Sequence, residues 1–170
     1  MTFNDGKEVS DEVMVREKVL FSTTSNIQYK FKNLNKLEVY NGSGIEVYHP
    51  IGTKRNKKTA KVSYGLGMKV YDSEFLEIFH ARFHYFKLDK RFTYIVQYNP
   101  KYDTFIRRKG EPFAYSVGCM DGYGYEGIFE RIKQFFEDCP EVIEQVKKRV
   151  INNRDIMTIA DYYNAHCDRK

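Results

Sequence analysis

Two histidines four residues apart, His80 and His84, are the first residues whose spacing could support chemistry. Imidazoles at this spacing fall on one face of a helix or of a strand, so both could face one metal ion. Ala81 follows the first histidine, however, where a zinc peptidase carries the glutamate that acts as its general base. The sequence places no third ligand, so we keep the pair as metal candidates and favour two ordinary histidines.

A glycine pattern of the dinucleotide-binding type, G-x-G-x-x-G, occupies residues 122–127 between a predicted strand and a predicted helix. A dinucleotide-binding fold also needs a second parallel strand after that helix, with an acidic residue near its end. Only helical patterns occupy the 43 residues that follow. We therefore assign the glycines to a strand-to-helix turn and predict no cofactor. No serine lies in a G-x-S-x-G pattern either, and we lean towards a protein that is not an enzyme.

Positive charge is concentrated in the middle of the chain. The whole chain has a net charge of +5, but residues 54–109 hold 14 Lys or Arg against five Asp or Glu, a net +9 that leaves −4 elsewhere. Runs of this kind can bind phosphate or anionic lipid, although most are solvated loops. The candidate binding residues are Lys54, Arg55, Lys57, Lys58, Lys61, Arg107 and Arg108.

Aromatic residues are interleaved with this basic region and could stack nucleic-acid bases while the cations hold phosphates. They are Tyr64, Tyr71, Phe83, Tyr85, Tyr94 and Tyr98. In a small nuclease, His80 or His84 would act as acid and base, and the cations would stabilise phosphate charge. That stabilising role would fall to Arg82, Lys87 or Arg107. The RNA-recognition strand signature is missing, and a chain with no Trp needs its aromatic residues for a core. Nucleic-acid binding or nuclease activity through Lys54–Lys109 is therefore the alternative function.

Three cysteines, Cys119, Cys139 and Cys167, are too few and too widely spaced for a zinc module. In an oxidising compartment two of them could form one disulfide and leave one thiol. In a reducing compartment all three would be small buried side chains. Composition alone leaves both alternatives open.

Short runs of β-branched and aromatic residues, mostly alternating with polar ones, predict strands in the first part of the chain. They occupy residues 13–21, 27–32, 36–40 and 45–50. The cluster Asn41-Gly42-Ser43-Gly44 between the last two runs predicts a hairpin turn. The basic run Lys54–Lys61 then falls in the connection that follows the hairpin.

Four further runs, separated by turn residues, predict the rest of an antiparallel meander. They occupy residues 79–87, 92–98, 102–108 and 113–119. One segment is ambiguous, because Phe75, Phe79, Phe83 and Phe86 recur at nearly helical spacing after Ser73, which could cap a helix. We expect a strand only in the second half of this segment.

After Gly127 the apolar period changes to that of helices. Apolar residues at 128, 129, 132, 135 and 136 form one stripe along a helix. Asp138 and Glu141, with Pro140 between them, resemble a capping box for a second helix. The inner face of that helix would carry Val142, Val146 and Val150. Asn153 could cap a last helix.

The sequence thus predicts one α+β domain over residues 13–167, after a loose N-terminus over residues 1–12. A mainly antiparallel sheet, as a meander or an open barrel, occupies residues 13–120, and a tail of two to three α-helices occupies residues 127–167. The longest apolar stretches are only a few residues long, far short of the roughly 20 that a membrane span needs.

Four short strings carry a family resemblance: residues 104–111, 135–141, 153–156 and 162–167. In them the chain resembles, over residues 102–167, small uncharacterised exported proteins of Bacteroidetes-type bacteria. The resemblance implies a β-rich protein of the cell envelope or secreted space, which is periplasmic or secreted once a signal peptide is removed. If the resemblance does not hold, the expected location is the cytoplasm. It also focuses attention on Cys139 and Cys167, which open and close the helical tail, because a disulfide between them would staple its helices.

The leading functional prediction is a non-catalytic binding or structural module of the cell envelope or secreted space. Its partner would be a protein, a glycan or another anionic ligand, and the basic connection Lys54–Lys61 is the most exposed contact candidate.

Overall fold

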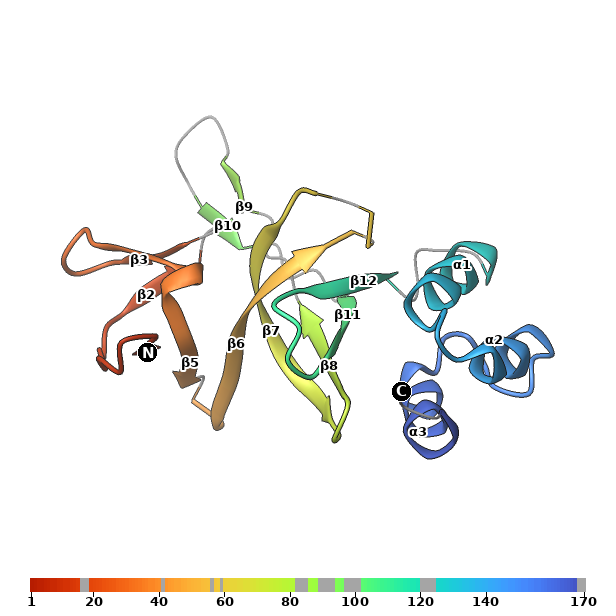
Figure 1. The fold of residues 1–170 in the computed structure, drawn as a ribbon. Coiled ribbons are helices and arrows are strands. Elements are labelled where there is room, and N and C mark those ends of the chain that lie inside the picture. The colour runs from red at the N-terminus through yellow and green to blue at the C-terminus, as the bar shows by residue number, and fades with distance from the viewer. Residues whose placement is uncertain are drawn as a thin grey trace.

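The computed structural model describes residues 1–15, 19–40, 42–55, 57–58, 60–81, 86–88, 94–96, 102–119 and 125–167. Strands make up the described chain up to residue 119, and helices follow, so the predicted α+β class is confirmed (Figure 1). The helices gather at one end of the molecule, and the N-terminal strands lie at the other. No helix within the described ranges is long and apolar enough to cross a membrane.

The strands are short except for two central ones of ten residues each. They are β1 (Thr2–Phe3), β2 (Val13–Val15), β3 (Val19–Ser22), β4 (Gln28–Lys30), β5 (Leu34–Tyr40), β6 (Ile45–Lys54), β7 (Ser63–Asp72), β8 (Leu76–Ala81), β9 (Phe86–Leu88), β10 (Tyr94–Val96), β11 (Asp103–Arg108) and β12 (Ala114–Cys119). The helices are α1 (Tyr125–Phe135), α2 (Pro140–Lys147) and α3 (Ile156–His166), and a 3₁₀ turn covers Phe31–Asn33.

Five strands form a closed ring of pairings. β6 pairs with β7, β7 with β8, β8 with β11 and β11 with β12, all antiparallel. The ring closes where β12 runs parallel to β6, with Ala114 opposite Thr53 and Tyr115 opposite Lys54. β5 and then β1 extend the sheet beyond β6. The predicted mainly antiparallel sheet is therefore present, closed by one short parallel pairing. The four-run meander is not, because β9 and β10 pair with each other in a separate two-stranded sheet and β8 pairs with β11.

The predicted hairpin at residues 41–44 is confirmed. β5 and β6 pair antiparallel, with Tyr40 opposite Ile45, and Gly42 has a φ of 85°, a left-handed conformation that suits glycine. Lys54 ends β6 and Ser63 begins β7, so the basic run lies in the β6–β7 connection, as expected.

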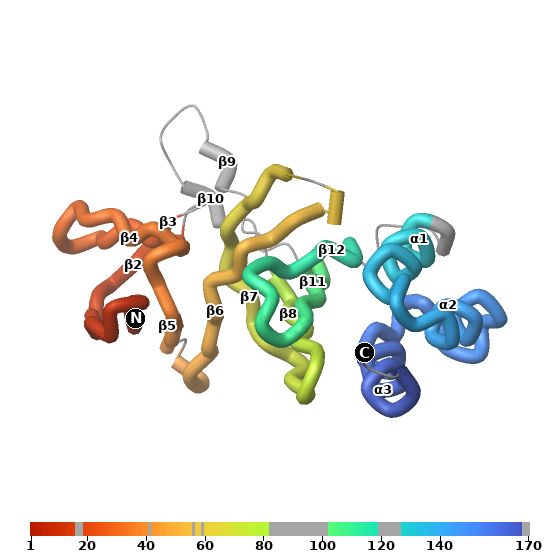
Figure 2. The backbone as a smooth tube through the Cα atoms, in the orientation of Figure 1, coloured from red at the N-terminus to blue at the C-terminus, as the bar shows by residue number. Residues whose placement is uncertain are grey.

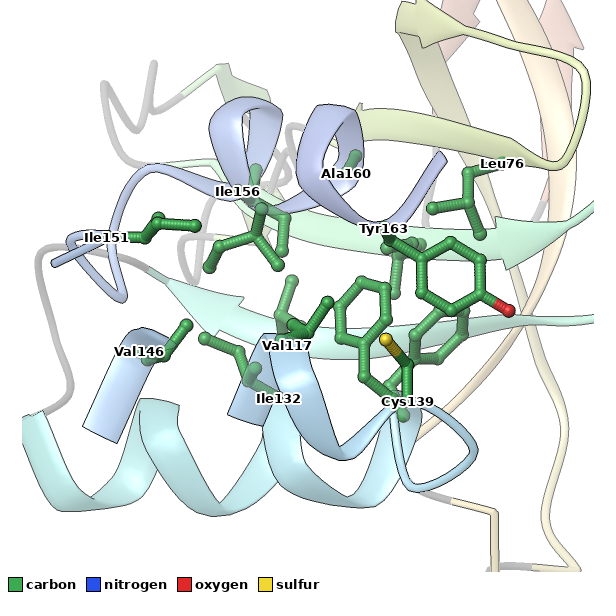
Figure 3. Close-up of a cluster of buried hydrophobic side chains, with 14 of the residues drawn as sticks. Leu76, Val117, Ile132, Cys139, Val146, Ile151, Ile156, Ala160 and Tyr163 are labelled. Carbon is green, nitrogen blue, oxygen red and sulfur yellow. The ribbon is translucent and has the colours of Figure 1, made fainter. Parts of the chain in front are cut away.

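The ring strands bury apolar side chains on both faces. Inside the ring lie Ile51, Phe79, Ala81, Phe105 and Ala114. The opposite faces of β8, β11 and β12 contribute Leu76, Ile78, Ile106 and Val117 to a core shared with the three helices. Figure 3 shows this second core, in which helical side chains such as Ile132, Val146, Ile156 and Tyr163 converge on the sheet. The sheet therefore anchors the helical tail through an apolar face.

The Phe75–Phe86 segment differs from the prediction. Its first half is the strand β8, between β7 and β11, and residues 82–85 lie outside the described residues. Burial on both faces replaces the alternating pattern with a continuous apolar run, which imitates a helical stripe. Ser73 caps the turn before the strand, because its hydroxyl accepts the backbone N–H of Leu76 at 3.0 Å.

Two strands occupy the run at 13–21, which the sequence presented as one. β2 and β3 pair antiparallel, and β4 completes a separate three-stranded sheet. Residues 1–12 also differ from the expected loose terminus. β1 pairs with β5, and the terminal amino group of Met1 donates to the carbonyl of Val9 at 2.8 Å. A strand of two residues carries no periodic signal, so only the partner strand reveals it.

The helix caps differ from the predicted ones. Cys139 is the N-cap of α2 and makes no side-chain capping bond, whereas Asp155, not Asn153, caps α3 by accepting the N–H of Thr158 at 3.1 Å. Val150 is exposed, because α2 ends at Lys147. The carboxylate of Asp138, expected at the start of α2, is used elsewhere in the fold.

Candidate functional site

The β6–β7 connection carries most of the predicted binding residues on the protein surface. Arg55, Lys57, Lys58 and Lys61 are exposed, and Lys54 at the end of β6 holds its Nζ 4.6 Å from the centre of the Phe113 ring. The connection is the yellow segment at the upper end of the β6–β7 pair in Figure 2, on the side of the helices. A cluster of cations from one short segment therefore faces solvent.

An ion pair ties this connection to the helical tail. Lys57 Nζ lies 2.8 Å from Glu137 Oε1, just beyond the end of α1. The positive charge of Lys57 lowers the pKa of the Glu137 carboxyl, through their hydrogen bond first and their charge attraction second. Glu137 is 65% exposed, so this pair is accessible to solvent and to ions.

A shallow pocket lies below the connection, between β12 and α1. Its polar lining comprises Arg55, Lys57, Ser116, Arg131 and Gln134. Its apolar lining comprises Ile106, Tyr115, Val117 and Phe135. The pocket is small, and its accessible lining is mainly apolar.

Arg131 is fixed at this pocket by the sheet. Its Nη1 donates to the carbonyl oxygen of Ser116 at 3.2 Å and to the Ser116 hydroxyl at 3.0 Å. Burial raises the pKa of the Asp103 carboxyl, and the positive charge of Arg131 partly offsets that rise. The guanidinium therefore has a defined position before any ligand arrives.

Arg107 does not join the basic connection. It lies on β11 opposite Glu77 of β8, and its Nη2 and Nε lie 2.6 and 2.8 Å from Glu77 Oε2. Lys69 Nζ lies 2.7 Å from the other carboxylate oxygen, and Lys109 pairs with Asp72 nearby. These charged side chains lie at one end of the ring interior. Arg107 therefore forms an ion pair within the protein and is not part of the basic connection.

Burial and the charges of this cluster shift the pKa values of Glu77 and His49. Burial alone would raise the pKa of Glu77, but hydrogen bonds and charge attraction from Lys69 and Arg107 outweigh it, and the pKa is lowered. Burial, with the nearby positive charges, lowers the pKa of His49, whose ring lies 6.5 Å from the Phe79 ring. Both shifts favour the deprotonated forms in the folded protein.

Arg108 is also internal and joins the sheet to the helical tail. Its two terminal nitrogens donate to the two carboxylate oxygens of Asp138 at 2.7 and 2.8 Å. They also donate to the hydroxyl of Tyr163 at 2.6 Å and to the carbonyl of Phe135 at 2.8 Å. We call these four residues the Arg108 clamp. A guanidinium with this many hydrogen-bond partners stabilises the contact between the sheet and the helical tail. Because Asp138 binds this guanidinium, it does not cap α2.

A disulfide lies next to the clamp. Cys139 and Cys167 are joined, with their Cα atoms 5.7 Å apart, and Cys139 follows Asp138 directly. Cys167 donates its backbone N–H to the carbonyl of Tyr163. The bridge thus links the beginning of α2 to the end of α3, the pair that the resemblance brought forward.

The remaining motifs do not assemble with these residues. His80 stacks on Tyr102 with ring centres 4.0 Å apart, and His84 lies outside the described residues. Within the described part of the chain, no group of three or more His, Cys, Asp or Glu could hold a metal ion. In the glycine pattern, 122–124 lie outside the described residues, and α1 already includes Gly127.

Only some of the aromatic side chains predicted to stack nucleic-acid bases can be located in the structure. Tyr64 is 39% exposed, and the Tyr71 hydroxyl donates to Asp161 at 2.6 Å. Phe83, Tyr85 and Tyr98 lie outside the described residues. Since Tyr71 joins the sheet to α3, it belongs to the internal structure and not to a stacking surface.

The sequence patterns did not indicate Arg131 and Gln134 at the pocket, nor Glu137 as the ion-pair partner of Lys57. Arg131 and Gln134 are three apart on α1, beside the apolar stripe, so a helical projection would have placed both at the edge of the sheet-facing surface. Glu77 was also missed, although a charge within an apolar strand signals a buried ion pair.

No family model, curated protein or solved structure matches the chain. The site is therefore interpreted from its own geometry and charge.

Proposed function

We propose that the protein is a non-catalytic binding module of the cell envelope or secreted space that holds an anionic partner through its β6–β7 connection. The observation that carries the proposal is the exposure of Arg55, Lys57, Lys58 and Lys61 on that one connection. Arg107 and Arg108 are satisfied inside the fold and leave the connection as the main candidate among the residues first considered.

The Cys139–Cys167 disulfide supports the compartment in this proposal. Disulfides persist in the periplasm and outside the cell, whereas cytosolic reductants keep most thiols reduced. The pairing agrees with the expectation drawn from the resemblance to exported proteins. A basic nucleic-acid-binding protein of the cytoplasm is the alternative.

The chemistry of the connection favours a partner with repeated negative charges. Exposed lysines and arginines on a solvated segment attract polyanions over a distance set by the ionic strength. An acidic glycan or an acidic protein surface has the density of carboxylates or sulfates that several cations can contact together.

Retention on an immobilised sulfated polysaccharide tests the proposal. The wild type should bind at low salt, and Lys57→Glu with Lys58→Glu should abolish retention. Lys30→Glu with Lys32→Glu is the matched control, because these lysines are exposed on β4 and on the 3₁₀ turn that follows it, and the net charge changes equally. The control should elute close to the wild type.

Two outcomes would contradict the proposal. Equal loss in both double variants would mean that net charge, not the connection, controls retention. Stronger binding to single-stranded RNA or duplex DNA than to the polysaccharide, at the same salt, would favour the nucleic-acid alternative.

A further inference from the structure

The turn between α2 and α3 carries exposed cations next to an exposed aliphatic side chain. Lys147 and Lys148 are 66% and 67% exposed, Arg149 is exposed as well, and Val150 is 70% exposed. The turn forms the outer end of the helical tail, far from the N-terminal strands (Figure 1). We propose that this α2–α3 turn docks on an anionic lipid surface. It would be a second binding surface, beyond the proposed role of the β6–β7 connection.

The backbone at the end of α2 holds a cation in a strained position. Arg149 has a φ of 59°, in the left-handed region. Its N–H donates to the carbonyl of Val146 at 3.0 Å, and the next N–H, of Val150, donates to the carbonyl of Gln145 at 3.0 Å. Helices often end in this Schellman geometry, with glycine at the left-handed position because a side chain is strained there. Strained backbone positions cluster at functional sites, which directs attention to this turn.

Val150 lacks the contact that such a helix ending often provides. The residue after the left-handed position frequently packs back on the helix, but Val150 faces solvent. The next residue, Ile151, is buried in the core shared with the sheet, as is Val146 before the turn. The turn is therefore anchored on both sides, and its exposed tip can enter a surface with little loss of backbone freedom.

The acidic side chain nearest the turn does not neutralise it. Glu144 Oε1 lies 3.7 Å from Lys147 Nζ, and Glu144 Oε2 lies 3.8 Å from Lys148 Nζ. All three side chains are at least half exposed, so these pairs are weak and are screened by salt. Residues 144–154 hold four Lys or Arg against this one carboxylate, so the segment presents a net positive charge to an anionic surface.

The aliphatic tip favours lipid over other anionic partners. Lys and Arg attract the phosphates of anionic headgroups, and an apolar side chain among them gains stability when it enters the boundary with the acyl chains. A nucleic acid or a sulfated glycan also attracts the cations, but it offers Val150 no apolar layer. Charge complementarity and the exposed valine together point to an anionic membrane surface.

A single tryptophan can report insertion of the tip, because the chain contains no Trp of its own. Val150→Trp places the reporter on the turn, and Ile45→Trp is the matched control, since Ile45 is 68% exposed on the distant β5–β6 hairpin. Both full-length, oxidised proteins are titrated with vesicles of phosphatidylcholine, alone or mixed equally with anionic phosphatidylglycerol. We expect a blue-shifted emission and protection from acrylamide quenching only for Val150→Trp with the anionic vesicles. An unchanged emission, or the same response from Ile45→Trp, would overturn the proposal.

Charge reversal tests the headgroup contacts in the chain that keeps Val150. Lys147→Glu with Lys148→Glu should weaken binding to the anionic vesicles at least about twentyfold, because each cation near an anionic surface contributes about fivefold. Lys57→Glu with Lys58→Glu changes the net charge equally and should weaken vesicle binding much less. Equal losses in the two double variants would overturn the proposal. The urea midpoints of the variants show whether each remains folded, and the Val150→Trp result does not depend on them.

The result is separable from the proposed function. Insertion of the turn without polysaccharide retention would support lipid docking and reject the proposed function. Polysaccharide retention that depends on Lys57 and Lys58, without insertion of the turn, would do the reverse. Binding of an acidic protein through Lys147 and Lys148, with no response to the vesicles, would also overturn the assignment to lipid.

Discussion

Removing the Arg108 clamp should weaken the attachment of the helical tail. The side chain of Arg108 on β11 is 22% exposed, and its guanidinium reaches Asp138, Tyr163 and the carbonyl of Phe135. The substitution Arg108→Ala leaves these three groups without their shared donor. It also removes the contacts of the guanidinium with the rings of Phe135 and Tyr163, at 5.0 and 5.4 Å from their centres.

The size of the effect follows from the exposure of the partners. Truncating one member of a fully buried ion pair costs about 3–5 kcal/mol. Asp138 is 47% exposed, so water replaces part of the lost interaction, and we reduce the ion-pair cost to about 1.5–3 kcal/mol. The ring contacts add about 0.5–1 kcal/mol. The expected loss of about 2–4 kcal/mol corresponds to a Tm lower by roughly 5–15 °C in a chain of this length.

Thermal and urea unfolding of the oxidised protein measure this loss. Arg108→Lys keeps the charge but cannot form the two-pronged contact with Asp138, so its Tm should fall between those of the wild type and Arg108→Ala. The double variant with Asp138→Ala should lose less stability than the sum of the single variants, because the two residues share one interaction. A Tm of Arg108→Ala within about 1 °C of wild type, or simple additivity, would refute the assigned role.

Three other perturbations follow from the structure. Acidification should destabilise the protein in two steps, because the folded protein lowers the pKa values of His49 and Glu77. The stability that His49 contributes is complete above its ordinary pKa of 6.5 and is lost as the pH falls from 6.5 towards its folded-state pKa. The stability that Glu77 contributes is lost in the same way as the pH falls below its ordinary pKa of 4.5. Chemical unfolding between pH 8 and 3 checks this, and Glu77→Gln should flatten the acid limb. Cys139→Ser should cost about 3–4 kcal/mol, the chain-entropy value for a bridge between residues 28 apart, and reductant should then have no further effect on its urea midpoint. Gly67→Ala should lower the urea midpoint by the equivalent of about 1–3 kcal/mol, because its Cβ would lie 3.0 Å from a core methyl, whereas Gly44→Ala, with open space, should change it little.

Local patterns in the sequence predicted the elements whose signals lie within a few neighbouring residues. The turn after Tyr40 and the apolar stripe through Ile128 and Ile132 each lie within a few residues, and both the β5–β6 hairpin and α1 are present. The β8 strand was harder to predict, since burial on both faces gave it an apolar run without alternation.

Local patterns could not predict which Lys and Arg side chains form ion pairs within the protein and which remain exposed. Arg107 and Arg108 are neighbours in sequence, yet they point to opposite faces of β11, one to Glu77 in the ring and the other to Asp138 by the helices. Their partners lie 30 residues away in opposite directions along the chain, so only the fold decides between binding and internal roles. The Lys54–Lys61 connection differs because its cations remain at the surface.

The salt dependence of polysaccharide binding tests whether the β6–β7 connection is the binding surface. Binding of the wild type and of the Lys57→Glu, Lys58→Glu variant to a soluble sulfated polysaccharide would be measured over a series of salt concentrations. We predict a steep fall of the wild-type binding constant with salt, and a slope smaller by about one for each cation contact removed from the variant. Identical slopes for the two proteins would contradict the assignment of the β6–β7 connection as the binding surface.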